Sequence, residues 1–126
     1  MYRIEKIGEN CFYIKTLGTF PPSVAERFGQ DFAEKTKGLK DYCVIVDNLD
    51  AILLDVNSFN IILDLMIKNN ERLMKSAFVI SENPPLDKEF QLLIEKSASP
   101  KRKIVQTLDE AKKWVGIEDI IIQRED

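Results

Sequence analysis

The sequence contains no histidine, the side chain that most often serves as a general base or a metal ligand near neutral pH. Its five glycines are scattered, so no glycine-rich loop is present to cradle a phosphate group. It also has no Cys-x-x-Cys pair, which zinc and redox sites commonly use. No apolar run is long enough to span a bilayer, and no signal-peptide segment follows the first residues. We therefore expect a cytoplasmic, non-enzymatic protein that carries no cofactor and no metal.

The length and the net charge of the chain further limit the kind of protein it can be. The chain has 126 residues, enough for one compact domain with a core, so we expect residues 1–126 to form a single domain. The net charge of −3 argues against nucleic-acid binding, which needs clustered excess Lys and Arg. The basic run Lys101-Arg102-Lys103 is interpreted as a solvated loop. Cys11 and Cys43 lie in strand-like runs and are interpreted as reduced, packed thiols, although the sequence leaves a disulfide open.

The first part of the chain predicts a hairpin followed by a helix. Two β-rich segments, residues 2–7 and 11–17, are separated by Gly8-Glu9-Asn10, which has turn composition. A helix is predicted to begin near Ser23, because Ser23 and Glu26 have the spacing of a capping box.

The rest of the chain alternates strands with helices. Residues 42–46 are almost continuously apolar, which predicts a central strand covered on both faces. The elements predicted after it are a helix over about residues 57–74, a strand at 77–80, a helix after Asn83-Pro84, a short strand at 103–105 and a last helix after Thr107. Ile120-Ile121-Ile122 is left open as a final turn, an edge strand or a contact surface.

This order predicts an α/β fold: a mixed, mainly parallel sheet of about four or five strands with about four helices and an N-terminal β-hairpin. In open sheets of this kind, ligands and partners gather at the carboxyl ends of the strands, where helices begin. Residues 53–59 form such a junction, because an apolar strand shortly precedes Asp55 and a strongly apolar helix pattern follows it.

The order and lengths of the elements resemble the STAS-domain family, which includes the anti-sigma-factor antagonists of the SpoIIAA type and related domains of anion transporters. The resemblance covers almost the whole chain. Family members carry a glycine after the second strand, which Gly18 matches, and an acidic residue shortly beyond it, which Thr19-Phe20-Pro21 lacks. Thr107-Leu108-Asp109-Glu110-Ala111 also resembles the start of the family's last helix. The topology carries more of this resemblance than the individual motifs do.

The family's signature is Asp-Ser-Ser-Gly-Leu at the start of the second helix, and its second serine is phosphorylated in the antagonists. Residues 55–59 resemble that segment, with Asp55 on the aspartate, Asn57 on the phosphoacceptor and Ser58 on the glycine. Asn57 cannot accept phosphate, so the family's kinase switch is put in doubt here. Ser58 stays open as a phosphorylation site, where the helix dipole would favour a phosphate and Asp55 would oppose it.

The candidate partner-binding residues are Asp55, Asn57, Ser58, Ile61 and Leu65. Helix capping alone is an alternative role for Asp55, Asn57 and Ser58, because such side chains accept hydrogen bonds from free helix amides. Ile61 and Leu65 form a second apolar stripe on the predicted helix, well away from Phe59, Ile62, Leu63 and Met66. This second stripe predicts either packing on a neighbouring helix or an exposed docking surface.

The leading hypothesis is a STAS-like regulatory domain that binds a protein partner, such as an anti-sigma-factor-like kinase or another regulator. The alternative is a small-molecule or lipid-binding α/β module, in which the apolar second helix and residues 120–122 line or cover a pocket. A third hypothesis is an enzyme that holds a metal on Asp47, Asp50 and Asp55. The sequence leaves dimerisation open.

Overall fold

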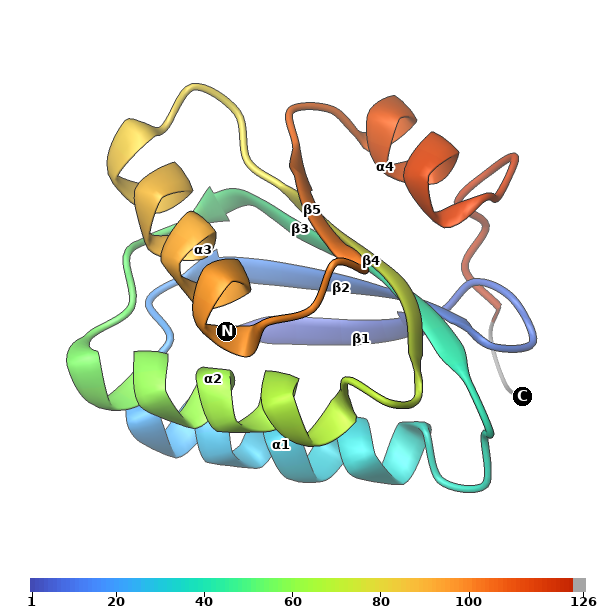
Figure 1. Cartoon of the computed structure of the whole chain (residues 1–126), viewed down its shortest axis with the longest axis horizontal. Coiled ribbons are helices and arrows are strands. Elements are labelled where there is room, and N and C mark those ends of the chain that lie inside the picture. The colour runs from blue at the N-terminus through green and yellow to red at the C-terminus, as the bar shows by residue number, and fades with distance from the viewer. Residues whose placement is uncertain (124–126) are drawn as a thin grey trace.

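The computed structural model describes residues 1–123 of the chain. Within these residues the chain forms five strands and four helices, and Figure 1 shows their arrangement. In chain order the elements are β1 (Tyr2–Lys6), β2 (Cys11–Gly18), α1 (Pro22–Lys35), β3 (Tyr42–Ala51), α2 (Val56–Asn69), β4 (Leu73–Val79), α3 (Pro84–Ser97), β5 (Arg102–Val105) and α4 (Leu108–Val115).

The strands form one sheet in the order β1-β2-β3-β4-β5. The hairpin partners β1 and β2 are antiparallel, and each following pair of neighbours is parallel. The predicted α/β class, the mainly parallel sheet and the N-terminal hairpin are therefore confirmed. Helices join the parallel strands because parallel neighbours need a crossover connection.

The boundaries that differ most from those predicted belong to β3, α2 and β4, since β4 begins at Leu73 and not at residue 77. The central strand β3 continues to Ala51, well beyond the predicted end at residue 46. The helix α2 ends at Asn69, whereas the sequence pattern predicted a helix to about residue 74. The side-chain Nδ2 of Asn69 donates to the carbonyl oxygen of Leu65 at 2.8 Å, at the end of this helix. The chain then turns, and Leu73 is already buried in β4.

The helices cover the sheet in two layers (Figure 1). Helices α1, α2 and α3 lie on one face, and α4 lies on the other. Side chains alternate between these layers along each strand, as the period of two in a strand requires. Phe12 and Ile14 of β2 pack with α1, whereas Cys11 and Tyr13 pack on the side of α4. The sheet therefore carries apolar cores on both faces.

The helix ends follow the predicted capping chemistry at two of three positions. The Asn83 side chain accepts from the amide of Leu86 at 3.4 Å, and Thr107 Oγ1 accepts from the amide of Glu110 at 3.1 Å. The capping box predicted at Ser23 is wrong, because α1 begins one residue earlier, at Pro22, with Pro21 as its cap. Proline suits the first helical position, since its fixed φ matches the helix and its missing amide proton costs nothing there.

Cys11 and Cys43 are free, buried thiols, as predicted. They are register partners on the adjacent strands β2 and β3. On the same face, the last helix packs through Trp114, which is half-buried and whose indole Nε1 donates to the carbonyl oxygen of Ser76 at 3.0 Å.

The C-terminal tail completes this face. Ile120 and Ile122 pack against the core under α4, whereas Ile121 is exposed. The amide of Gln123 donates to the carbonyl oxygen of Lys6 at 2.7 Å and forms an antiparallel bridge with β1. Of the alternatives left open for the tail, pairing as an edge strand is therefore seen, over this one bridge to β1.

The interpretation of Lys101-Arg102-Lys103 as a solvated loop is wrong. Arg102 begins β5 and projects toward α2, where its guanidinium Nη2 donates to the carbonyl oxygen of Met66 at 2.9 Å. Ile104, two residues later, packs in the same layer, as the strand period requires. Lys103 is exposed and lies over the Trp114 ring on the opposite face, with its Nζ 5.2 Å from the ring centroid.

Arg72 joins the end of α1 to the start of β4. Its Nη1 donates to the carbonyl oxygens of Thr36 and Leu39, each at 3.1 Å, and its Nη2 donates to the Thr36 hydroxyl at 3.1 Å. The guanidinium also lies over the buried Tyr42 ring, 5.3 Å from its centroid. This arginine therefore binds carbonyl groups of the connection that follows α1.

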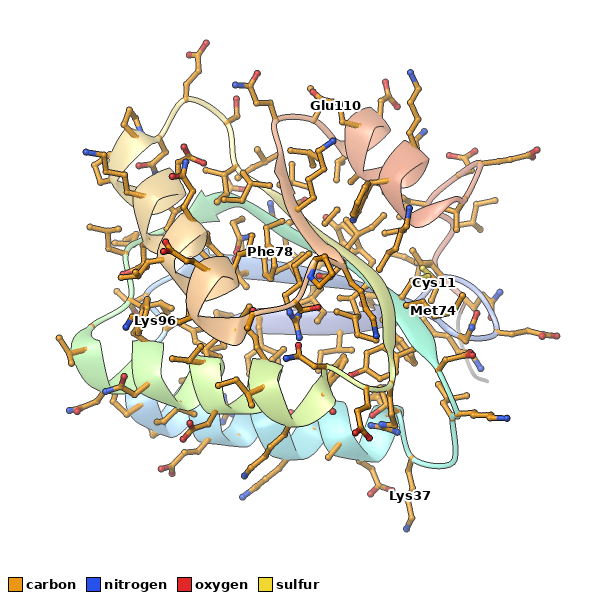
Figure 2. The ribbon with its side chains drawn as sticks, in the orientation of Figure 1. Cys11, Lys37, Met74, Phe78, Lys96 and Glu110 are labelled. Carbon is orange, nitrogen blue, oxygen red and sulfur yellow. The ribbon has the colours of Figure 1, made fainter. Side chains whose placement is uncertain are left out.

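Replacing Arg72→Met is expected to lower the free energy of unfolding by about 2–3 kcal/mol, because Thr36 and Leu39 lose their hydrogen bonds to a charged donor. The matched control is Lys37→Met, an exposed residue in Figure 2 on the connection after α1 that Arg72 binds, which should change stability by less than about 0.5 kcal/mol. Urea unfolding measures both variants. Equal effects of the two substitutions would show that the hydrogen bonds of Arg72 contribute nothing.

Candidate functional site

The carboxyl ends of the parallel strands meet at one edge of the sheet, toward the left of Figure 1. Four connections lie at this edge: residues 19–21 after β2, 52–55 after β3, 80–83 after β4 and 106–107 after β5. In open α/β sheets this is the edge where ligands and partners bind. The sequence-predicted site residues belong to the connection after β3 and the helix that follows it.

Asp55 is the N-cap of α2. Its Oδ1 accepts a hydrogen bond from the backbone amide of Ser58 at 2.7 Å, which satisfies one of the free amides at the helix start. The capping role that the sequence left open for Asp55 is therefore present. Asn57 is exposed in the first turn beside it.

Ser58 lies on the inner side of the same turn and is fully buried. Its hydroxyl has no hydrogen-bond partner among residues 1–123. A kinase could therefore reach this hydroxyl only after the first turn of α2 had opened. Phosphorylation of Ser58 stays a prediction, and it would require the first turn of α2 to open.

Ile61 and Leu65 are half-buried and pack in the core cluster that α1 forms with the sheet. The close approach of the two helices is seen at Gly29, where an added Cβ would lie 3.6 Å from Cδ1 of Leu65. The sequence left two alternatives for this second stripe, packing on a neighbouring helix or an exposed docking surface. In the structure the stripe packs on the neighbouring helix α1. The first stripe, which contains Phe59, Ile62, Leu63 and Met66, packs with β4 and α3.

Three apolar side chains of this junction are exposed, and the sequence analysis did not select them. Ile52 is 56% exposed, Leu53 is 48% exposed and Val56 is 76% exposed. Leu49, near the end of β3, is 44% exposed. The signal in the sequence was an apolar run that continues past the strand into a loop, where polar residues are usual. Ile52, Leu53 and Val56, which flank Asp55 and Asn57 in the chain, are named here the loop surface.

Helix α3 holds the backbone of the connection that carries the loop surface. The amide of Leu54 donates to Oε1 of Glu89 at 2.9 Å. Burial raises the pKa of the Glu89 carboxyl, and the hydrogen bond from Leu54 opposes that shift. The connection between β3 and α2 is thus held by its own cap on one side and by a neighbouring helix on the other.

A second group of polar side chains lies between the ends of β2 and β3. Asp47 is buried and accepts hydrogen bonds from the Tyr13 hydroxyl, from Nζ of Lys15 at 3.2 Å and from the amide of Leu49 at 3.1 Å. Lys15 also pairs with Asp50 at 2.7 Å. Because Lys15 of β2 pairs with two carboxylates of β3, this group ties the two strands together at the irregularity in their register.

The metal hypothesis for Asp47, Asp50 and Asp55 receives no geometric support. Asp55 is engaged as a helix cap, and the other two carboxylates pair with Lys15. Over residues 1–123 no three side chains of the metal-binding types come together as a site. None of the helices in this range is long and apolar enough to cross a membrane.

A partly open cavity of about 110 Å³ lies between the sheet and helices α1, α2 and α3. It is lined at the carboxyl edge by Gly18, Ile52 and Leu54, and at the amino ends of the strands by Tyr42 and Arg102.

Comparison with known proteins gave matches only at the level of structure. No family model and no curated protein sequence matches the chain. An uncharacterised DUF3478-family protein with a SpoIIAA-like fold, from Shewanella loihica PV-4, superposes with a TM-score of 0.70 at 15% identity, covering 90% of this chain and 91% of its own. The protein TM1081 superposes with a TM-score of 0.67 at 19% identity, covering 90% and 88%.

The unphosphorylated anti-sigma factor antagonist SpoIIAA superposes with a TM-score of 0.62 at 14% identity, covering 92% of this chain and 98% of its own. The strand order, the N-terminal hairpin and the helix layers agree with these near-complete superpositions. The chain has the SpoIIAA-like fold. At these identities the likeness shows the fold alone, and the predicted resemblance is confirmed at that level.

Replacing Ser58→Ala is expected to raise the free energy of unfolding by about 1 kcal/mol. The substitution removes a buried hydroxyl without a partner and introduces a better helix former. Thermal and urea unfolding measure the change, with Ser23→Ala, an exposed serine in the first turn of α1, as the matched control. A loss of stability at position 58 would mean that the hydroxyl makes a stabilising hydrogen bond.

The group around Asp47 predicts a loss of stability at alkaline pH. Burial and then the hydrogen bond to Asp47 raise the pKa of Tyr13. Burial lowers the pKa of Lys15, but its hydrogen bonds to Asp50 and Asp47 outweigh this, so the net shift is upward. A group with a raised folded-state pKa contributes stability below its unfolded pKa, about 10 for both side chains, and that contribution is lost as the pH rises further.

Urea unfolding between about pH 8 and pH 11 should therefore show stability falling above about pH 10. In Tyr13→Phe the fall should be shallower, because one of the shifted groups is gone. A wild-type profile that stays flat over this range, or an unchanged slope in the variant, would contradict this account of the Asp47 group.

Proposed function

We propose that this chain is a non-catalytic regulatory domain of the STAS type, which acts by binding a protein partner at the loop surface. The observation that carries the proposal is the exposure of Ile52, Leu53 and Val56 at the carboxyl edge of a SpoIIAA-like sheet. Exposed apolar residues that gather on one functional edge are typical of interaction sites. An anti-sigma-factor-like kinase or another regulator is the partner class that the fold suggests.

The chemistry of the surface narrows the kind of partner. Its apolar residues are accompanied by the exposed carboxylates of Asp50 and Asp55. A complementary partner would present an apolar centre with basic side chains at its rim, because opposite charges at a rim steer association. Asn57 would make a neutral hydrogen-bonding contact at the position that accepts phosphate in the antagonists. Binding should therefore not be switched by phosphorylation at residue 57.

Ile61 and Leu65 have a supporting role in this proposal. They hold α2 on α1, and so they position the first turn that carries Asn57. Substitutions with charged residues there would disturb the core as well as any interface. The exposed residues of the loop surface are consequently the sharper test of partner binding.

The test is a pull-down from lysate of the native host with wild type, Val56→Asp and Ile52→Asp. Each variant places a charge in the centre of the proposed interface and should weaken partner binding by about tenfold or more. Because both positions are exposed, thermal unfolding of the variants should remain close to that of wild type.

The matched control is Ile67→Asp, an exposed apolar residue near the other end of α2. It adds the same charge to the same helix but lies outside the loop surface, and it should retain the partner. A partner lost equally from Ile67→Asp and Val56→Asp would place the interface elsewhere. A partner retained by both loop variants would refute binding at the loop surface.

A further inference from the structure

The cavity between the sheet and α2 carries a charged side chain at one end. Its walls are almost entirely apolar, including Ile14, Val44, Ile62 and Phe78, and Figure 2 labels Phe78 between α3 and the sheet. Polar side chains line it only at its ends. At the carboxyl edge the Thr16 hydroxyl donates to Asn48 at 2.8 Å, and at the other end lie Tyr42, Asn69, Ser76 and Arg102, the one charged residue of the lining. An apolar space with a few polar groups is the usual form of a small-molecule site.

Arg102 is the charged group at that end. Its Nη2 donates to the carbonyl oxygen of Met66 at 2.9 Å and to Oδ1 of Asn70 at 3.1 Å. Its Nε is buried and has no hydrogen-bond partner among residues 1–123. One donor of a positively charged guanidinium is therefore unused in the interior, which is costly unless an acceptor is supplied.

The charge of Arg102 is also unbalanced locally. Within the described part of the chain, no carboxylate lies within 4.0 Å of Arg102 or of Arg72, whose guanidinium covers the neighbouring Tyr42 ring. Burial lowers the pKa of Arg102 to about 10, so the side chain keeps its charge at neutral pH. Burial raises the pKa of the Tyr42 hydroxyl, whereas the charges of Arg72 and Arg102 both act to lower it. Both charges therefore reach the Tyr42 end of the cavity.

We propose that this cavity binds a small apolar carboxylate, with its carboxylate group at Arg102 and Tyr42 and its hydrocarbon part against Val44, Ile62 and Phe78. A carboxylate would supply both the missing acceptor for Nε and the missing negative charge, and arginine is well suited to bind it. The hydrocarbon part would fill space that the side chains leave unpacked. This site goes beyond partner binding and does not depend on it.

The volume sets the size of the ligand. An apolar protein cavity of about 150 Å³ holds a benzene molecule. The 110 Å³ found here is smaller, so the cavity suits a single short hydrocarbon chain and excludes a two-chain lipid. Short-chain fatty acids are the class that follows from this size, and hexanoate is a suitable probe.

The test is a titration of the protein with hexanoate at pH 7, followed by the shifts of backbone amide signals in nuclear magnetic resonance spectra. The expected result is saturable shifts of amides that line the cavity, such as those of Val44 and Ser76. Hexan-1-ol, which has the same chain length without the charge, should bind about tenfold or more weakly. No saturable shift with hexanoate, or equal binding of the alcohol, would overturn the proposal.

Variants of the arginine test the role of its charge. Arg102→Met should weaken hexanoate binding by about tenfold or more. The matched control is Lys103→Met, which removes the same charge from the next residue of β5 but on the opposite face, over Trp114. It should leave hexanoate binding unchanged. Arg102→Met with wild-type affinity would refute the anchoring role of Arg102.

The carbonyl oxygen of Met66 loses its arginine donor in Arg102→Met, so a second variant guards against a failure to fold. Tyr42→Phe removes only the hydroxyl and keeps the ring that packs in the core. It should weaken binding of hexanoate but leave binding of hexan-1-ol unaltered. Equal effects of this substitution on the two probes would show that the Tyr42 end of the cavity does not recognise the carboxylate.

Discussion

The rest of the structure depends on the burial of β3 between two layers of helices and two parallel neighbours. Val44 faces the layer of α1 and α2, while Ile45 faces α4, so that the strand is held from both sides. Its ladder with β2 and β4 aligns the carboxyl ends of three strands. This alignment brings three separate connections to one edge. The edge is therefore a consequence of how the central strand is buried.

The connection between β3 and α2 inherits its position from that strand. The amide of Ile52 donates to the carbonyl oxygen of Gly18 at 3.0 Å at the start of this short segment. At its end Glu89 of α3 binds the amide of Leu54, and Asp55 caps the helix. The side chains of Ile52, Leu53 and Val56 on this held backbone remain in solvent. A segment with fixed backbone and exposed apolar groups loses little conformational freedom on binding, which favours its use as a docking surface.

The proposed partner surface and the cavity share residues. Ile52 is exposed at the loop surface and also lines the cavity, and Leu54 lines it from the same connection. If binding at one site changes the affinity at the other by moving this connection, the reverse effect must have the same magnitude. The connection after β3 is the segment that the two proposed sites share, so any direct coupling between them would pass through it.

The sequence predicted the order of the elements because their patterns are local. The almost continuous apolar run of residues 42–46 indicated a central strand, and the Asn83 and Thr107 caps marked two helix starts correctly. The sequence also selected the junction around Asp55. It did not predict that Ile61 and Leu65 would meet α1, since a second apolar stripe fits a neighbouring helix and a docking face equally well.

Arg102 shows most clearly where sequence reasoning stops. Between two lysines it had the composition of a solvated loop, but the alternation of Arg102 with Ile104 places its side chain on the inner face of β5. Only the packed structure shows that Met66 and Asn70 bind it and that a cavity adjoins it. The exposure of Val56 likewise depends on how α2 packs against the rest of the protein, and the residues next to Val56 in the sequence do not determine that packing.

The measurement that tests the central claim most directly is photo-crosslinking in cells of the native host, with a photoreactive amino acid at position 56. The account predicts one discrete crosslinked protein from position 56 and none from position 121, which is also exposed and apolar but lies on the C-terminal tail. The absence of a discrete product at position 56, or the same product from both positions, would contradict the claim that the edge after β3 is the working surface of this protein.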